Sequence, residues 1–195
     1  MKKVISAVLA AAVLLLCGCA KTETSVPSGM KLASVEAVDY YMYVPNDWII
    51  ADQDGVTAAY VSLTDKSNVT CACYTIQNEA VFDIPADRAE GEADGVTYAK
   101  NYWTGYASQL QASLPGFTLI SGPAATLLNG QPAVRCRYSA RMSDVDYTFE
   151  MVICVRERMF AYLLTYTAES ARFDANLPSF ESIVTEFVFQ TGVLK

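Results

Sequence analysis

Residues 134–142, VRCRYSARM, and residues 147–155, YTFEMVICV, decide the fold of this chain. In both stretches apolar side chains alternate with mostly polar ones, which is the period of a β-strand with one face on a core. The two apolar faces coincide if Cys136 lies opposite Ile153, which leaves residues 143–146 as the loop. The pair therefore predicts an antiparallel hairpin.

Further strands are expected on both sides of this hairpin. They are residues 39–45, 56–63, 69–77, 117–128 and 160–166. Turns rich in Asn, Asp and Gly separate them, and Asn129-Gly130 is the clearest hairpin signal. The first three strands predict an antiparallel meander.

Two helices are expected among these strands. Residues 97–114 show a helical period, and Pro115-Gly116 stops it. One face of this helix gathers Ala99, Tyr102, Trp103, Tyr106, Ala107, Leu110 and Leu114. A closing helix is expected over 179–187, directly after Pro178. The sequence therefore predicts an α+β domain with a central antiparallel sheet.

Composition excludes several classes of function. The chain contains no histidine, which excludes Ser-His-Asp and Cys-His nucleophile systems and zinc sites with histidine ligands. Its formal net charge is −7, and contacts with phosphate dominate nucleic-acid affinity, so nucleic acid is not expected as a partner. An enzyme that uses paired carboxylates stays open, although no spacing of acidic residues indicates one.

The N-terminus carries a targeting signal. Residues 4–16 form an apolar run after Lys2 and Lys3, shorter than the roughly 20 residues of a membrane-spanning helix. Leu16-Cys17-Gly18-Cys19 resembles the lipobox of bacterial lipoproteins. The resemblance implies a diacylglyceryl thioether on Cys19, usually with an acylated (for example palmitoylated) amino group, which anchors the protein in the bilayer on the extracytoplasmic face of the cell membrane. An ordinary secretory signal cut nearby is the alternative.

This signal divides the chain. Residues 1–18 are expected to be a signal peptide, residues 19–37 a lipidated cysteine with a flexible tether, and residues 38–190 a single domain. Cleavage before Cys19 removes Lys2 and Lys3, so the formal net charge falls from −7 to −9. Such an acidic chain needs its acyl anchor to stay on an anionic membrane.

Three features together resemble the PsbP-like group, which includes the extrinsic photosystem II subunit and DcrB-like bacterial lipoproteins. They are a Tyr-rich strand ending in Val44-Pro45 with Trp48 just after it, the mid-chain aromatic helix, and Pro178-Ser179-Phe180-Glu181-Ser182-Ile183-Val184 leading to Phe187. The resemblance covers about residues 38–190. It implies a central antiparallel sheet of about six to seven strands with helices on both faces, an α/β/α sandwich.

The same resemblance bears on function. Members of the group bind other proteins or assist the assembly of membrane complexes, and none of their motifs is catalytic. It therefore supplies no catalytic residue and no cofactor. Some plant members use histidines for metal, and this chain lacks them, so a metal site is not expected.

Four cysteines fall inside the expected domain, namely Cys71, Cys73, Cys136 and Cys154. Opposite strand faces argue against a Cys136–Cys154 bridge, and Cys71 and Cys73 are poorly placed to bridge each other. Three interpretations stay open. These are a disulfide from the third strand to the hairpin, free buried thiols, and a thiolate metal or redox site at Cys71-Ala72-Cys73.

The polar face of the hairpin carries the arginines. They are Arg135, Arg137, Arg141 and Arg156, with Arg158 near the rim. This face could bind an anionic partner through the guanidinium forks. Alternatively, a helix covers the face and its acidic side chains pair with the arginines.

Residues 78–95 form an acidic loop. Glu90-Gly91-Glu92-Ala93-Asp94-Gly95 has the alternating oxygen ligands of an EF-hand, but Asn101 stands where that motif needs a glutamate. A solvated loop is the simpler interpretation, and calcium binding is the alternative.

We therefore expect a non-catalytic, membrane-anchored module that binds an envelope protein or assists assembly. Its working surface would be the arginine face or the loop at 78–95. The alternative is an envelope protein that binds a small ligand or ion, with a pocket between the long helix and the sheet.

Overall fold

The computed structural model of the protein describes residues 25–34, 37, 39–51 and 54–190. The lipobox and Cys19 lie outside the described residues.

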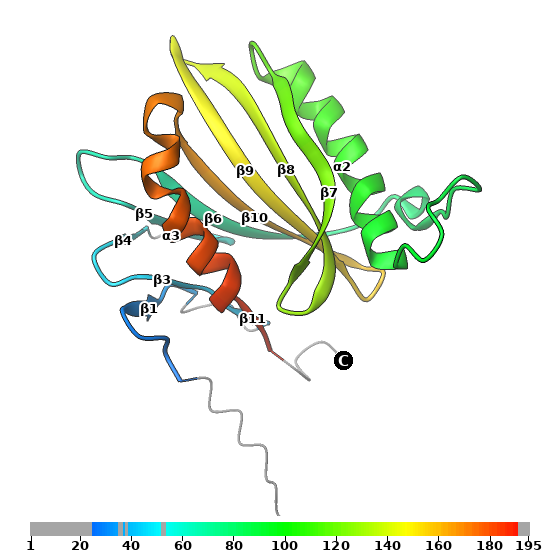
Figure 1. Ribbon diagram of the computed structural model, residues 1–195, viewed down its shortest axis with the longest axis horizontal. Helices are drawn as coiled ribbons and strands as arrows, with labels where there is room; N and C mark the ends of the chain where they lie inside the picture. Colours follow the sequence, from blue (N-terminus) through cyan, green and yellow to red (C-terminus); the bar gives the residue numbers. More distant parts are fainter. Residues whose placement is uncertain (1–24, 35–36, 38, 52–53, 191–195) are drawn as a thin grey trace, which may run out of the picture.

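The centre of the fold is an antiparallel sheet of seven strands (Figure 1). Its strands are, in the order in which they lie side by side, β4 (Ile49–Ala51), β5 (Val56–Tyr60), β6 (Asn68–Thr75), β10 (Phe160–Glu169), β9 (Val145–Arg156), β8 (Gln131–Met142) and β7 (Thr118–Leu128). The sheet thus consists of two meanders, β4–β6 and β7–β10, which meet where β6 pairs with β10. The expected hairpin is present, and so is the antiparallel pairing of the second and third expected strands. The first strand of the expected meander, residues 39–45, was wrong, because these residues lie in two small separate sheets and β4 takes their place beside β5.

The β8–β9 hairpin has a tighter turn than the sequence analysis predicts. Cys136 lies opposite Met151, and Met142 opposite Val145. Only Ser143 and Asp144 remain in the turn, and their φ angles of 47° and 65° are those of a type I′ hairpin. The expected pairing of Cys136 with Ile153 was wrong by two residues. The faces were right, because a shift of two residues returns each side chain to the same side.

Helices cover both faces of the sheet (Figure 1). Helix α2 (Asp94–Ser113) packs on one face, over β8 and β9, where Trp103, Tyr138, Phe149 and Ile153 belong to one buried cluster. Helix α3 (Phe173–Glu186) follows the short 3₁₀ turn η2 (Ser170–Arg172) and packs on the other face. The predicted α+β fold with helices on both faces is confirmed.

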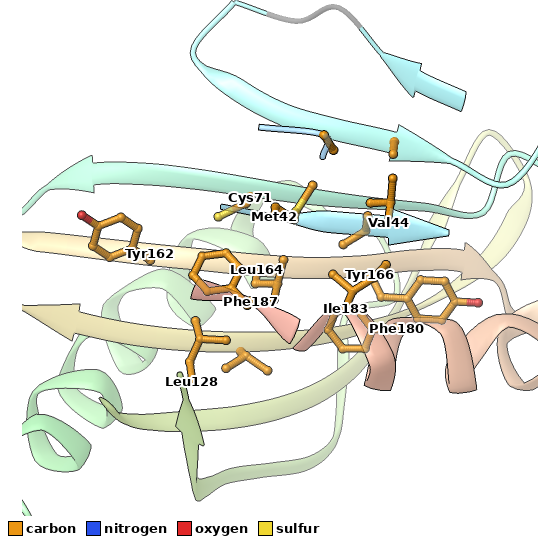
Figure 2. Close-up of a cluster of buried hydrophobic side chains, with 14 of the residues drawn as sticks. Met42, Val44, Cys71, Leu128, Tyr162, Leu164, Tyr166, Phe180, Ile183 and Phe187 are labelled. Atoms are coloured by element: carbon orange, nitrogen blue, oxygen red, sulfur yellow. The ribbon is translucent and has the colours of Figure 1, made fainter. Parts of the chain in front are cut away.

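The core under α3 is rich in aromatic side chains (Figure 2). Phe180 and Ile183 of α3, and Phe187 just after it, are fully buried against Tyr166 and Leu164 of β10. The rings of Tyr166 and Phe180 stack with their centroids 5.6 Å apart. This packing fixes α3 on the sheet, as its apolar spacing predicts.

Both helices begin earlier than expected. Helix α2 begins at Asp94, and α3 begins at Phe173, so Pro178 lies inside α3 rather than before it. Pro178 cannot donate a hydrogen bond to the preceding turn, which normally disfavours a helix interior. Burial of Phe173, whose carbonyl accepts a hydrogen bond from the Tyr166 hydroxyl, holds the first turn in place. No helix in the described part of the chain is long and apolar enough to cross a membrane.

A short arm precedes the sheet and belongs to the domain. β1 (Met30–Leu32) pairs with β3 (Tyr43–Pro45), and β2 (Tyr40–Tyr41) pairs with β11 (Val188–Phe189). Met42 is the residue between β2 and β3. Its amide donates a hydrogen bond of 2.8 Å to the buried Ser34 hydroxyl. The domain therefore begins before residue 38, and the expected tether is shorter by at least residues 30–34.

Candidate functional site

The strongest cluster of charged side chains lies between the sheet and α3. Arg135 and Arg137 point from β8 to the same face, and Glu150 of β9 lies directly opposite Arg137. The two oxygens of Glu150 pair with the Nε atoms of Arg135 and Arg137. Glu181 of α3 pairs with the other end of Arg135, and one of these bonds measures 2.9 Å. We call these four residues the arginine–glutamate clamp.

Aromatic rings of α3 enclose the clamp. The Arg135 guanidinium lies 5.7 Å from the ring centroid of Phe180, and that of Arg137 lies 4.9 Å from the ring of Phe173. The Glu150 side chain is only 5% exposed. Hydrogen bonds to Glu181 and Glu150 raise the pKa of Arg135, against the effect of burial, so its charge is fixed. The clamp is a closed set of two positive and two negative groups.

Arg135 and Arg137 therefore contact acidic side chains of the protein itself instead of forming a surface of unpaired arginines. The alternative interpretation, in which a helix covers the face and its acidic side chains pair with the arginines, describes the structure. The partly buried guanidinium of Arg135 already holds two carboxylates and has few donors left for a partner, whereas Arg137 holds only Glu150, through its Nε atom. The clamp ties α3 to the sheet through the pairing of Glu181 with Arg135.

The other two arginines do not join the cluster. Arg141 lies at the hairpin turn, is 56% exposed, and has a 3.8 Å contact with Asp144. Arg156 lies at the opposite end of the sheet, where its guanidinium packs 4.3 Å from the ring centroid of Phe189. Because β8 and β9 are long and antiparallel, residues that share one polar face are spread along its whole length.

The four cysteines are free thiols. Cys71 and Cys154 belong to the core under α3, whereas Cys136 belongs to the core under α2. Strand β10 lies between β6 and β9, so a bridge from the third strand to the hairpin would have to span at least two strand spacings, about 9.6 Å. A disulfide needs Cα atoms within about 6.8 Å, so of the three open interpretations the cross-strand bridge does not fit this geometry and free buried thiols do.

Burial also lowers the reactivity of these thiols, because it raises their pKa. It raises the pKa of Cys73 to about 11, with the nearby Asp39 adding to the effect. Burial raises the pKa of Cys136 and that of Cys154 to about 12. A thiolate at neutral pH is what a redox or metal site requires, and these surroundings oppose it.

Some of the charged side chains of the loop at 78–95 form ion pairs within the loop or with α2. It opens with the 3₁₀ turn η1 (Glu79–Phe82), whose Val81 and Phe82 are buried near the start of α2. Arg88 pairs with Asp94, and Lys100 pairs with Glu92. Hydrogen bonds from Lys100 and Thr97 lower the pKa of Glu92. Among the described residues, no three Cys, Asp or Glu side chains come together to hold a metal ion.

A groove lies where the N-terminal arm meets α3. Its volume is about 520 Å³ and it is open to solvent. Its walls are Pro27, Ser28, Gly29, Met30, Pro45, Pro178, Ser179, Ser182 and Glu186. The groove is on the α3 side of the molecule, whereas the ligand-binding alternative of the sequence analysis placed a pocket between the long helix and the sheet.

Comparisons with known proteins show which solved structures share this fold. No family model matches the chain, and no curated protein matches it. The chain is similar to cyanobacterial PsbP from Synechocystis sp. PCC 6803, with 15% identity and a TM-score of 0.55 over 90% of this chain and 99% of that one. The fold is PsbP-like. The chain is also similar to LpqN, which is involved in cell envelope biogenesis of Mycobacterium tuberculosis, with 13% identity and a TM-score of 0.55 over 83% of this chain and 90% of that one.

The expected resemblance to the PsbP-like group is confirmed at the level of the fold. Within this PsbP-like fold, sequence reasoning missed the central role of Glu150. The sequence feature that could have indicated this role is a single acidic residue in the middle of an apolar strand, opposite two arginines of the neighbouring strand. It also missed Asp39, whose carboxylate accepts a hydrogen bond from the Tyr162 hydroxyl at 2.5 Å. Asp39 and Tyr162 are 123 residues apart, so no local pattern joins them.

Proposed function

We propose that the protein is a non-catalytic binding module of the cell envelope, held on the extracytoplasmic face of the membrane by an acylated Cys19. The observation that carries this proposal is the closed arginine–glutamate clamp, because the main charged cluster of the described residues stabilises the fold instead of facing a substrate. The raised pKa of the buried thiols supports the same conclusion. The likeness in fold to LpqN supports a role in the envelope.

The anchor is tested with two cysteine variants. Cys19→Ala should release the protein from the membrane fraction, because no thioether can form. Cys17→Ala is the matched control, since it keeps Cys19 and places a common lipobox residue at that position. Mass spectrometry of the mature N-terminal peptide should find the acyl groups in the control only. Membrane association of Cys19→Ala would contradict the anchor.

The binding role is tested by photo-crosslinking in intact cells. The surface left for a partner is the loop at 78–95, which projects from the sheet beside α2 (Figure 1). A photoreactive residue in place of the 44% exposed Ile84 should capture a defined envelope protein. The same residue in place of Leu63, which is 72% exposed on the β5–β6 connection, is the control. Equal capture of the same proteins at both positions would contradict a specific site in the loop.

A second candidate function is binding of a small ligand in the groove beside α3. Its volume of about 520 Å³ falls within the range of small-molecule sites, about 300–1,000 Å³. A ligand that binds only the folded state raises the melting temperature with its concentration. A thermal-shift screen of the full chain against Glu186→Gln, a change in the groove wall, would identify such a ligand. A shift that is identical in both proteins would place the ligand elsewhere.

A further inference from the structure

A long part of the chain carries no charge. Charged residues make up 18% of the sequence, yet none occurs between Lys100 and Arg135. At the average frequency about six would be expected in these 34 positions. Surfaces of soluble domains normally mix both signs of charge. An uncharged stretch of this length is therefore unusual if the fold places it on the surface.

The structure exposes this stretch on one flank. It comprises most of α2, the connection after it, and all of β7, which contacts α2 and is the last strand of the sheet (Figure 1). Leu119 and Leu127 lie opposite Tyr138 and Pro132, which face α2, so both leucines are on the α2 side of β7. They are 43% and 60% exposed. We call the exposed residues of 101–131, about twenty in number, the neutral flank.

The polar groups of the neutral flank are already partly satisfied. On α2, the hydroxyls of Thr104 and Ser108 donate to the carbonyls of Lys100 and Thr104, both at 3.0 Å. The hydroxyl of Ser113 donates to the carbonyl of Gln109 at 2.7 Å. Covering a hydroxyl that already has a partner costs less than covering one bonded only to water. This helix face can therefore be buried at a low desolvation cost.

Gly105 gives the flank a further feature. It lies in the middle of α2, where glycine weakens a helix, and a Cβ there would meet nothing within 4 Å. The packing of the described residues thus gives no reason for this glycine. A second backbone approaching α2 closely would give one.

The charge of the whole chain points to the kind of partner. With a net charge of −7, two copies repel each other through most of their surfaces. A twofold interface sets one patch against its own copy, so a patch of one sign cannot form it and an uncharged patch can. Thr118 and Ala124 lie opposite Ser139 and Arg135 and so face the α3 side. The remaining exposed residues, on the α2 side and along the strand edge, number fewer than twenty and fit an interface below the standard size of 20–30 residues per side. The regular run Ala124–Leu128 of β7 offers an unpaired strand edge to an antiparallel copy of itself.

We propose that the neutral flank is the surface through which two copies of this chain associate. The twofold axis passes through the flank, with β7 and the C-terminal part of α2 of each copy facing those of the other. Charge depletion at the centre of the contact, with exposed leucines, is the composition expected of such an interface. The inference does not depend on the proposed function, since it concerns copies of this chain alone.

The experiment uses the full chain in intact cells, with a photoreactive residue in place of Gln109 on the exposed side of α2. Irradiation should give a covalent dimer of twice the monomer mass. Leu119→Glu with Leu127→Glu should reduce the dimer more than about tenfold, and so should Leu119→Lys with Leu127→Lys, because like charges then face each other. Co-expression of the Glu and Lys variants under different tags should restore a mixed dimer.

A matched control carries Ile50→Glu with Leu63→Glu, two apolar residues outside the flank that are 38% and 72% exposed. It should keep the dimer at the unaltered level. The restored mixed dimer also shows that both charged variants are folded. The proposal is overturned if the unaltered chain gives no dimer, if the Glu variant keeps it, or if the flank crosslinks only to a different protein.

Discussion

Glu150 gives its two carboxylate oxygens to two different arginines on the neighbouring strand. The group is nearly inaccessible to water, so its charge is tolerated only because both partners are in place. Glu181 holds the same Arg135 from the surface side and is 47% exposed. The two glutamates that pair with Arg135 thus lie in different surroundings. Removal of each should lower the free energy of unfolding by a different amount.

The first prediction compares these glutamates. Glu150→Ala should lower the free energy of unfolding by about 3–5 kcal/mol, because it leaves two half-buried guanidinium groups without a carboxylate. Glu181→Ala should cost only about 0.2–1 kcal/mol, since water replaces an exposed carboxylate easily. Urea titrations of both variants measure the difference. Equal losses would mean that the clamp is not as closed as its geometry indicates.

The second prediction concerns thiol reactivity. With its pKa raised from 9.0 to about 11, Cys73 should react with iodoacetamide at pH 8 about a hundredfold more slowly than in the unfolded chain. Cys136 and Cys154, which are buried, should be slower still. Peptide mass spectrometry with and without denaturant gives the rates. Rapid labelling of the native protein would show that these strands open.

At the scale of single elements, sequence periodicity predicted the faces better than the ends. The alternation in β8 and β9 assigned Arg135 and Arg137 to one face and Cys136 to the other, as observed. It could not fix the hairpin register, because a two-residue shift preserves every face and only the turn at Ser143-Asp144 decides. Glu181 comes from an element 46 residues away from Arg135, so the clamp itself could not be read from either strand.

Helix α2 offers the third prediction through its two glycines. Gly105→Ala should raise the free energy of unfolding by about 0.5–1 kcal/mol, because the new methyl group meets open space and restricts the unfolded chain. Gly95→Ala is the control on the same helix, where the new Cβ would lie 3.0 Å from Pro132, so it should gain less or lose stability. Thermal unfolding at low protein concentration compares them. A larger gain for Gly95→Ala would contradict this packing.

At the scale of the molecule, the antiparallel sheet and the two covering helices followed from the sequence, whereas the order of the strands in the sheet and the beginning of the domain did not. Residues 30–34 are too short a stretch to establish a strand period, and they directly follow Pro27, Ser28 and Gly29, which are typical of a linker. They are held by pairing with β3 and by two hydrogen bonds of the Ser34 hydroxyl, which donates to the carbonyl of Tyr40 and accepts from the amide of Met42. Such tertiary contacts override a local composition that reads as a linker.

The fourth prediction tests this boundary. A chain that starts at residue 38 should melt about 5–10 °C below one that starts at residue 25, because the Met42 amide loses its buried partner and β3 loses its strand neighbour. Differential scanning calorimetry of the two chains gives the comparison. Equal melting temperatures would show that residues 30–34 do not stabilise the domain and belong to the tether.

The pairing of β1 also decides how the protein bears mechanical load. Met30, where a pull from a membrane anchor would enter, lies opposite Pro45, and the next pairs follow along the strand. Such a pull loads the residue pairs of β1 and β3 one after another, beginning at Met30, so these few pairs should separate before the long strands of the main sheet do. We expect β1 to detach at low force in single-molecule pulling from the N-terminus, well before the sheet ruptures. A single high-force event would show that arm and sheet yield together.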